Sequence, residues 1–492
     1  MTQAGAEPDH FAASPVRLRF LLSPFRALAL IWAVWAAVNI AVFGPAVAAG
    51  DLGDTDNYMR LAQWRDFLAG QDWFDVRQHR FVGPENGDMH FSRLPDLALS
   101  IFHWPLSAAF GAATAERITL VAFPPAMMLV FLMLIVATAK EIAGLRAAYA
   151  AAPLALLASP VVQQFAPGRI DHHGIALCLA MAALWFCVRG LKRPGMAAPS
   201  AAAAILAAAI SLETLPVAAA GFAVVGLSWA LEKNAQPLRV FGAAAVVLAP
   251  AVLLATLGPA GMADRHCDMF AAPAAAFMTS AGLFAAGLSF TRPADAMVRI
   301  ILAFAVAIAI AAGLSLAFPQ CAGGPFQGMD PLVRNVWLNS VGEIRSPFAL
   351  AASSPGMLFS LYGFPIAALA AGIMSVTRAS AEERPARAAA LIFLAFSMLL
   401  LVIAIRGGTL ASAFAILPFA VVLSDASRDV RFFPPKNAAR FMAFFLVASP
   451  STYAALGGLA DEGRKAPAEP NAAARGVSCS DPASIGALRA LP

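Results

Sequence analysis

Charged residues are scarce in this sequence. Lysine, arginine, aspartate and glutamate make up 13% of its 492 residues, while hydrophobic residues make up 60%. Soluble domains are roughly one quarter charged and about half apolar, so a string of soluble domains is excluded. Apolar runs long enough to cross a membrane recur along most of the chain, and backbone groups in lipid must find partners within their own segment. The sequence therefore predicts an all-α, polytopic membrane protein.

Cysteine is also scarce, with five residues and no Cys-x-x-Cys pair. This pattern excludes the common cysteine-based zinc and iron–sulfur motifs. Cys178 and Cys187 lie inside one apolar run and are predicted to pack against neighbouring helices. Cys267, Cys321 and Cys479 lie in segments predicted to be outside the cytoplasm. A disulfide between Cys267 and Cys321 is compatible with that placement.

A strongly basic region is missing too, since the formal net charge is only +5 and basic residues form short clusters between apolar runs. Such clusters set membrane topology and do not indicate a nucleic-acid surface. The first apolar run is longer than the core of a cleaved signal and is interpreted as an uncleaved span. About thirteen spans are predicted, at roughly 27–49, 118–138, 147–166, 174–189, 199–213, 215–231, 238–258, 273–290, 298–317, 346–376, 388–404, 408–424 and 441–458.

The basic clusters orient these spans, because they all fall on one side if the N-terminus is cytoplasmic. Two long loops, 50–117 and 318–345, then lie on the outer side. Residues 96–113, inside the first loop, are apolar but short, and they are predicted to form an interfacial helix. The predicted divisions are a cytoplasmic N-terminal segment, a transmembrane domain and a flexible periplasmic tail, at residues 1–26, 27–458 and 459–492.

Two polar clusters fall on the predicted outer side. Asp54 and Asp56 follow the first span, and two carboxylates at this spacing suit a hard divalent cation. A solvated turn and helix cap is the alternative interpretation. Asp171 and His173 precede the fourth span as candidate oxygen and nitrogen ligands of one metal, unless the loop is simply polar. His172 is adjacent to His173, so the two histidines are not expected to face one site.

Three further polar residues stand at the predicted outer ends of apolar runs. Glu343 ends the second long loop in the segment 340–343, Ser-Val-Gly-Glu, and a boundary residue without function is its alternative. Arg406 lies between two apolar runs, where it suits a phosphate or carboxylate, or else serves as a topology anchor. Glu213 lies at a tight turn and is predicted to line the same cavity or to cap a helix.

The order of these clusters resembles that of GT-C superfamily membrane glycosyltransferases, in particular the catalytic subunit of oligosaccharyltransferases. In that family the first outer loop opens with an Asp, and an Arg follows six residues later, as in Asp54 and Arg60. Thr55 replaces the usual Pro. The segment 171–173, Asp-His-His, is similar to the Asp-x-His motif of archaeal members.

Two later motifs extend the resemblance. The segment 340–343 is similar to the Ser-Val-Ser-Glu-type motif of the family's fifth outer loop, with Gly in the third place. Arg406 stands where an outer-face Arg of the family contacts the phosphate of a lipid-linked donor. The soluble C-terminal domain of the family, with its Trp-Trp-Asp motif, has no counterpart here, so the acceptor is left open among lipid, polysaccharide and protein.

The resemblance implies an inverting transfer of a sugar or oligosaccharide from a polyprenyl-phosphate-type carrier. The reaction would take place at the periplasmic face of a bacterial inner membrane. Arg406 would bind the donor phosphate, and Asp56 would be a further metal ligand or would position or deprotonate the acceptor. Arg60, His172 and Glu213 are candidate cavity residues. The implied ligands of a divalent cation, Mn²⁺ or Mg²⁺ with the histidine favouring Mn²⁺, are Asp54, Asp171, His173 and Glu343.

Two other functions are compatible with the sequence. One is a transporter or flippase of a lipid-linked substrate, and the other is a metal-independent GT-C enzyme of the protein mannosyltransferase or lipid A aminosugar transferase type. Transporters place ionisable residues near the middle of the membrane, commonly on broken helices in two related halves. Here the acids are predicted at one face and the halves show no similarity, which favours an enzyme.

Overall fold

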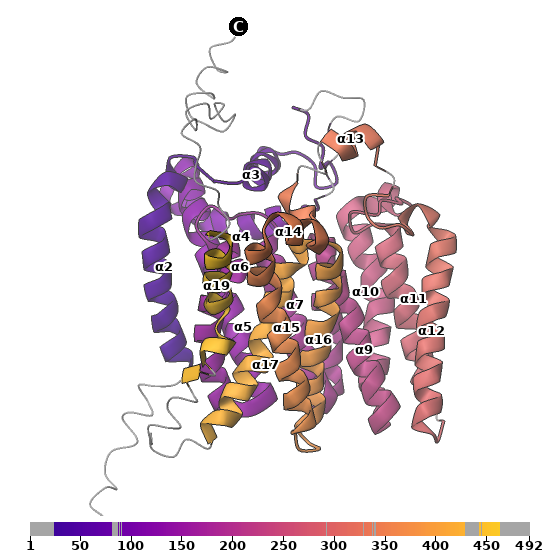
Figure 1. Cartoon of the computed structure of the whole chain (residues 1–492). Coiled ribbons are helices and arrows are strands. Elements are labelled where there is room, and N and C mark those ends of the chain that lie inside the picture. Colours follow the sequence, from indigo (N-terminus) through magenta and orange to yellow (C-terminus); the bar gives the residue numbers. More distant parts are fainter. Residues whose placement is uncertain are drawn as a thin grey trace, which may run out of the picture.

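The computed structural model describes residues 24–80, 87, 89, 91–291, 293–327, 329–336, 338, 341–428, 442–443 and 445–462. Within these residues the chain is helical and contains no strand, which confirms the predicted all-α class. Long helices stand side by side, with α2 at one edge of the bundle and α12 at the opposite edge (Figure 1). The short helices α3 and α13 lie at the upper end in this view, which is called the α3 end below.

The α-helices of the described residues are numbered along the chain. Their bounds are α2 Pro24–Ala48, α3 Thr55–Leu68, α4 Leu94–Phe110, α5 Ala112–Leu157, α6 Ser159–Val162, α7 His173–Lys192, α8 Ala197–Ile210, α9 Leu215–Glu232, α10 Ala235–Gly261, α11 Ala272–Leu288, α12 Ala296–Ala317, α13 Pro331–Val336, α14 Pro347–Ser353, α15 Pro355–Thr377, α16 Arg384–Ile403, α17 Gly408–Arg428 and α19 Pro450–Glu462.

Nine helices among the described residues are long and apolar enough to cross a membrane. One of them, α5, leaves helical geometry at Ala143 and Gly144 and is therefore two consecutive helices. The predicted apolar runs all fall mainly on helix, but the count of thirteen spans is not confirmed. The run 346–376 divides at Ser354 into α14 and α15, and part of the last run lies outside the described residues.

Burial separates central helices from peripheral ones. The apolar window of α17 is 94% buried within the bundle, whereas that of α12 is 0% buried and that of α2 is 17% buried. Apolar surface without a protein partner is what a helix presents to lipid. The helices α2 and α12 are therefore the lipid-facing margins, and α17 is the central helix against which α5 and α15 pack.

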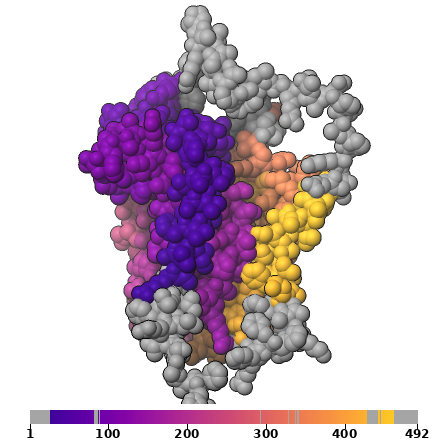
Figure 2. Space-filling model, turned by 90° about the vertical axis from the view of Figure 1, so that its left-hand side faces the viewer, coloured from indigo at the N-terminus to yellow at the C-terminus, as the bar shows by residue number. Residues whose placement is uncertain are grey.

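The first long loop contains α3 and α4. Most of the interfacial helix predicted at residues 96–113 coincides with α4. Ile101 and Trp104 are 60% and 51% exposed on one face of α4, while Asp96 and Ser100 are buried on the other. The segment 94–120 lies beside the upper end of α2, which runs along the face shown in Figure 2. The position of α4 at a membrane interface stays a prediction.

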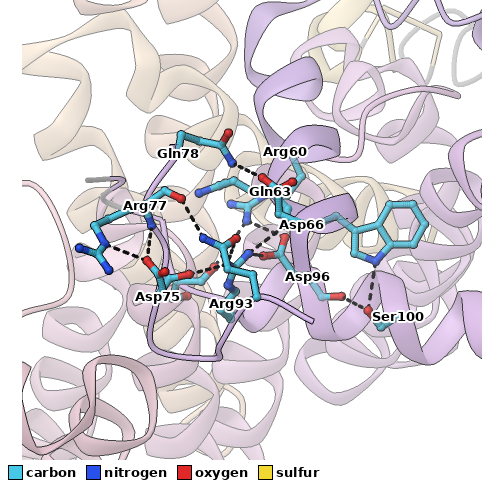
Figure 3. A network of polar contacts seen from close by, with 12 residues as sticks. Arg60, Gln63, Asp66, Asp75, Arg77, Gln78, Arg93, Asp96 and Ser100 are labelled. Atoms are coloured by element: carbon cyan, nitrogen blue, oxygen red, sulfur yellow. Dashed lines mark hydrogen bonds and ion pairs between the residues drawn. The ribbon is translucent and has the colours of Figure 1, made fainter. Parts of the chain in front are cut away.

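A buried carboxylate joins α4 to α3. Asp96 forms ion pairs with Arg60 Nη1 at 2.9 Å and with Arg93 Nη1 at 3.0 Å (Figure 3). All three side chains are nearly inaccessible to solvent. Trp64 Nε1 donates to Ser100 Oγ at 3.0 Å a turn further along both helices. The structure thus places Arg60, a candidate cavity residue, in an internal ion pair that holds α3 in position.

A disulfide joins Cys267, after α10, to Cys321, after α12, as the sequence allowed. Cys178 and Cys187 are free and buried, in agreement with their predicted packing role. Cys479 lies outside the described residues, as do residues 1–23 of the predicted cytoplasmic segment and most of the predicted tail.

We expect Asp96→Ala to destabilise the fold strongly. The substitution leaves two buried guanidinium groups without their anion, and breaking a buried pair in this way costs about 3–5 kcal/mol. The free energy of unfolding in detergent micelles measures the effect. Asp66→Ala is the control, because Asp66 pairs with the exposed Arg80, and a loss as large as that of Asp96→Ala would contradict the assignment.

Candidate functional site

Polar residues from separate loops meet at the α3 end of the bundle. Successive long helices run in opposite directions, so every second connection lies at this end. Charged side chains from different loops are close enough to shift the pKa values of Asp54 and Asp56. The residues are Asp54 and Asp56 after α2, Arg169 to His173 before α7, Glu213 before α9, Glu343 before α14 and Arg406 before α17.

Asp54 has two roles. It is the N-cap of α3, where its Oδ1 accepts a hydrogen bond from the amide of Asp56 at 3.0 Å. Its Oδ2 pairs with Arg169 Nη1 at 2.5 Å. The helix cap and the functional interpretation, treated as alternatives in the sequence, therefore both apply to this side chain.

The two aspartates of this turn differ in acidity. Burial opposes ionisation of Asp54, but the Asp56 amide and the Arg169 guanidinium outweigh it and lower the pKa of Asp54. Burial and the neighbouring Asp54 raise the pKa of Asp56, although Arg406 opposes this effect. Environments that push two carboxyl pKa values apart separate an ionised ligand from a potential proton acceptor.

Arg169 links the first loop to the Asp171 loop. Besides Asp54 it faces Asp171, with 3.0 Å between Nη2 and Oδ2, and it donates to Gln164 Oε1 at 2.8 Å. The turn before it depends on Gly168, which has φ +86°. A Cβ there would lie 3.0 Å from Val47 Cγ2, so a larger residue would push this loop away from α2.

Asn57 joins the same two loops by hydrogen bonds. Its Oδ1 accepts hydrogen bonds from the amides of Ile170 at 3.1 Å and Asp171 at 3.2 Å. Its Nδ2 donates to the carbonyl of Leu52 at 3.3 Å, and the residue is completely buried. One side chain thus sets the separation between the Asp54 turn and the Asp171 turn.

Both histidines face one site, so the expectation that they would not is wrong. Ligand atoms of His172, His173 and Glu213 lie within 4.8 Å of one another. His172 has helical φ and ψ at the start of α7, and its ring lies 4.1 Å from the His173 ring, centroid to centroid. Adjacent residues entering a helix need not point in opposite directions, as they would in a strand.

This group can accept a divalent cation. Imidazole nitrogen and carboxylate oxygen are suitable ligands for such an ion. Asp171 Oδ2, at the same loop, is buried and accepts no hydrogen bond, although the Arg169 cation is close to it. This oxygen is therefore a candidate ligand, although the Arg169 cation now faces it.

Arg406 faces two carboxylates. Its Nε pairs with Glu213 and lies 3.7 Å from Glu343 Oε2. The amide of Ile405 donates to the carbonyl of Arg345 at 3.1 Å, which joins the Arg406 loop to the Glu343 loop. Ser340, the first residue of the predicted motif that ends at Glu343, lies outside the described residues.

Sequence reasoning therefore identified most members of this cluster and overlooked two. Arg169 received no role, although a charged residue beside Asp171 in a charge-poor chain was a usable signal. Asn57 gave no signal, because its two acceptor bonds go to backbone amides more than a hundred residues away. Neither spacing nor composition indicates a contact of that kind.

Comparison with known proteins agrees with the resemblance seen in the motifs. The family model "Oligosaccharyl transferase STT3, N-terminal" matches residues 64–214, a segment that includes Asp171, His173 and Glu213. No curated protein matches the chain. The resemblance to the oligosaccharyltransferase catalytic subunit is confirmed, while Asp54, Glu343 and Arg406 lie outside the matched segment.

Several of the similar solved structures are of an archaeal enzyme, the oligosaccharyltransferase AglB of Archaeoglobus fulgidus. The complex with an inhibitory peptide and a dolichol-phosphate has a TM-score of 0.62 and 15% identity, over 91% of this chain and 56% of that chain. The complex with Zn and sulfate has a TM-score of 0.56 and 16% identity, over 82% and 49%. The form tethered to an acceptor peptide containing the NVT sequon has a TM-score of 0.51 and 14% identity, over 86% and 55%.

This chain thus spans about half the length of the AglB structures that it matches. At such identities the likeness is one of fold. It places the helical bundle described above in the GT-C architecture.

We expect Asn57→Ala to loosen the Asp171 loop. The change leaves two buried amides without an acceptor, and each unsatisfied buried group costs about 1–3 kcal/mol. Hydrogen–deuterium exchange should show faster exchange over residues 170–171. Asn39→Ala is the matched control, because Asn39 bonds only within α2, and unchanged protection of residues 170–171 in Asn57→Ala would contradict the role.

Proposed function

We propose that this protein is a glycosyltransferase that moves a sugar or oligosaccharide from a polyprenyl-phosphate-type lipid carrier to an acceptor. One observation carries the proposal: carboxylates, two histidines and two arginines converge at one end of a polytopic helical bundle. The STT3 family match and the AglB-like fold support the same assignment.

We propose that the reaction depends on a divalent cation. Asp171 and His173 would hold it, with Asp54, Glu343, His172 and Glu213 as the neighbouring ligands. The neighbouring AglB fold has been solved with Zn, and the histidines favour Mn²⁺ over Mg²⁺ at this site. When bound, the ion would supply positive charge opposite a departing phosphate.

Arg406 would hold the phosphate of the donor. A guanidinium binds phosphate oxygens through two parallel hydrogen bonds, and Glu213 and Glu343 already orient this one. The AglB fold has been solved with a dolichol-phosphate and with a sulfate, each of which carries a tetrahedral anionic group. Neutralising charge as it develops on the leaving phosphate lowers the barrier to transfer.

Asp56 would act on the acceptor. Its raised pKa makes it a better proton acceptor than an ordinary aspartate, and it lies in the field of Arg406 and His173. One AglB structure carries a tethered acceptor peptide with the NVT sequon, so a peptide is the first acceptor to test here.

We place the reaction on the periplasmic side of a bacterial inner membrane. The predicted orientation puts the N-terminus in the cytoplasm and the α3 end outside. The Cys267–Cys321 disulfide supports this orientation, since structural disulfides persist in oxidising compartments. The same arrangement argues against a transporter, because the ionisable cluster lies at one end of the bundle.

Site substitutions should abolish transfer. We expect Asp54→Ala, Asp171→Ala, Glu343→Ala and Arg406→Ala each to lower the rate of sugar transfer by about a hundredfold or more, because each removes charge from the reacting centre. Transfer of a labelled sugar from a polyprenyl-phosphate donor to a sequon peptide by the purified protein provides the measurement.

The matched control for these substitutions is Glu116→Ala. Glu116 forms an ion pair with Arg65 elsewhere on the first loop, and its loss should leave transfer unchanged. Full activity in all three acidic variants would show that the ligand assignment is incorrect.

Metal removal should also stop the reaction. We expect a chelator to abolish transfer and added Mn²⁺ to restore it more effectively than Mg²⁺, because two imidazoles contribute to the site. The same transfer assay measures this effect. Undiminished transfer in excess chelator would favour the metal-independent type of GT-C enzyme instead.

A further inference from the structure

A guanidinium stands between the two carboxylates proposed as metal ligands. Arg169 Nη1 lies 2.5 Å from Asp54 Oδ2, and Nη2 lies 3.0 Å from Asp171 Oδ2. The Arg169 side chain is only 20% exposed, and Asp171 is almost fully buried. The contact with Asp171 is therefore held in a protected environment, where charge–charge interactions are stronger than in water, while the Asp54 side chain is 35% exposed.

The other oxygens of both carboxylates are already engaged. Asp54 Oδ1 accepts from the Asp56 amide at 3.0 Å, and Asp171 Oδ1 accepts from the His173 amide at 3.0 Å. The two Oδ2 atoms are thus the ones turned toward the interior of the site, and both face Arg169.

The side chains whose ligand atoms lie close enough together to share one metal ion do not include these two aspartates. The group consists of His172, His173 and Glu213, and neither Asp54 nor Asp171 is close enough to join it. An ion that both carboxylates coordinate would have to occupy the space beside their Oδ2 atoms. The Arg169 guanidinium fills that space, and arginine cannot lose its charge to make room.

We propose that Arg169 is a resident cation that competes with the divalent metal for Asp54 and Asp171. This inference rests on the proposed function, because it assumes that these carboxylates bind the metal. Coordination by them requires Arg169 to leave its two partners. Arg169 therefore sets a low affinity for the ion and keeps both carboxylates neutralised while the ion is absent.

The contacts of Arg169 suit such an exchange. Its third contact is with the neutral Gln164 Oε1, at 2.8 Å, and its buried Nε has no hydrogen-bond partner among the described residues. Asn57 holds the Asp171 turn by backbone bonds that do not involve Arg169. The guanidinium can thus move without loss of the loop geometry.

The test is a Mn²⁺ titration of the full-length protein in detergent, followed by electron paramagnetic resonance of the free ion. We expect Arg169→Gln to bind Mn²⁺ roughly tenfold more tightly than the unaltered protein, since the competing charge is gone. Arg169→Lys should fall between the two, because one ammonium cannot span both carboxylates. Arg65→Gln, which removes a surface ion pair between α3 and Glu116 of α5, should not change the affinity.

Thermal unfolding gives a second readout. In chelator, Arg169→Gln should unfold at a lower temperature than the unaltered protein, because its carboxylates repel each other, and Mn²⁺ should raise that temperature more in the variant. If Arg169→Gln does not fold, the test of the competitive role depends on Arg169→Lys. That variant must then bind Mn²⁺ more tightly than the unaltered protein.

Two results would overturn the inference in different ways. Mn²⁺ binding that is unchanged or weaker in the Arg169 variants would remove the competitive role and leave the proposed metal centre intact. An absence of Mn²⁺ binding in every protein, with sugar transfer retained, would remove the metal centre itself.

Discussion

The need to pair every backbone group within lipid determines the rest of this structure. It makes each apolar segment a helix, and consecutive helices then alternate in direction. Every second connection consequently lies at the same end of the bundle. Loops that are more than three hundred residues apart, such as those of Asp54 and Arg406, become neighbours without any long excursion of the chain.

Charge at that end is arranged in opposed pairs. Asp96 is held by two arginines inside the first loop, Asp54 and Asp171 share Arg169, and Glu213 faces Arg406. Pairing of this kind limits the cost of keeping ions away from bulk water. Under the proposed function, an incoming metal or phosphate would exchange with a resident partner, so that binding would replace one ion pair with another.

Much of this arrangement could be predicted from the sequence. Apolar runs placed the helices, and basic clusters gave an orientation that collects Asp54, Asp171 and Arg406 at one end. These features depend on one-dimensional patterns that the membrane imposes directly. The fold comparisons agree with the helical architecture, and the disulfide is compatible with the predicted orientation.

What could not be predicted depends on side-chain geometry. Arg60 pairs with Asp96 because α3 and α4 cross there, and no spacing rule gives that crossing. The joint orientation of His172 and His173 follows from the local backbone at the start of α7. The number of spans is not confirmed for a similar reason, since the predicted run 346–376 breaks at Ser354, a local departure within continuous apolar sequence.

The disulfide has a consequence for how the chain is made. Cys267 and Cys321 are 54 residues apart, and α11 and α12 lie between them. During synthesis Cys267 must wait until both of these helices have been made before its partner can reach it. Oxidation of this pair therefore requires both helices to be in place, and it fastens the end of α12, whose apolar window is 0% buried, to the end of α10.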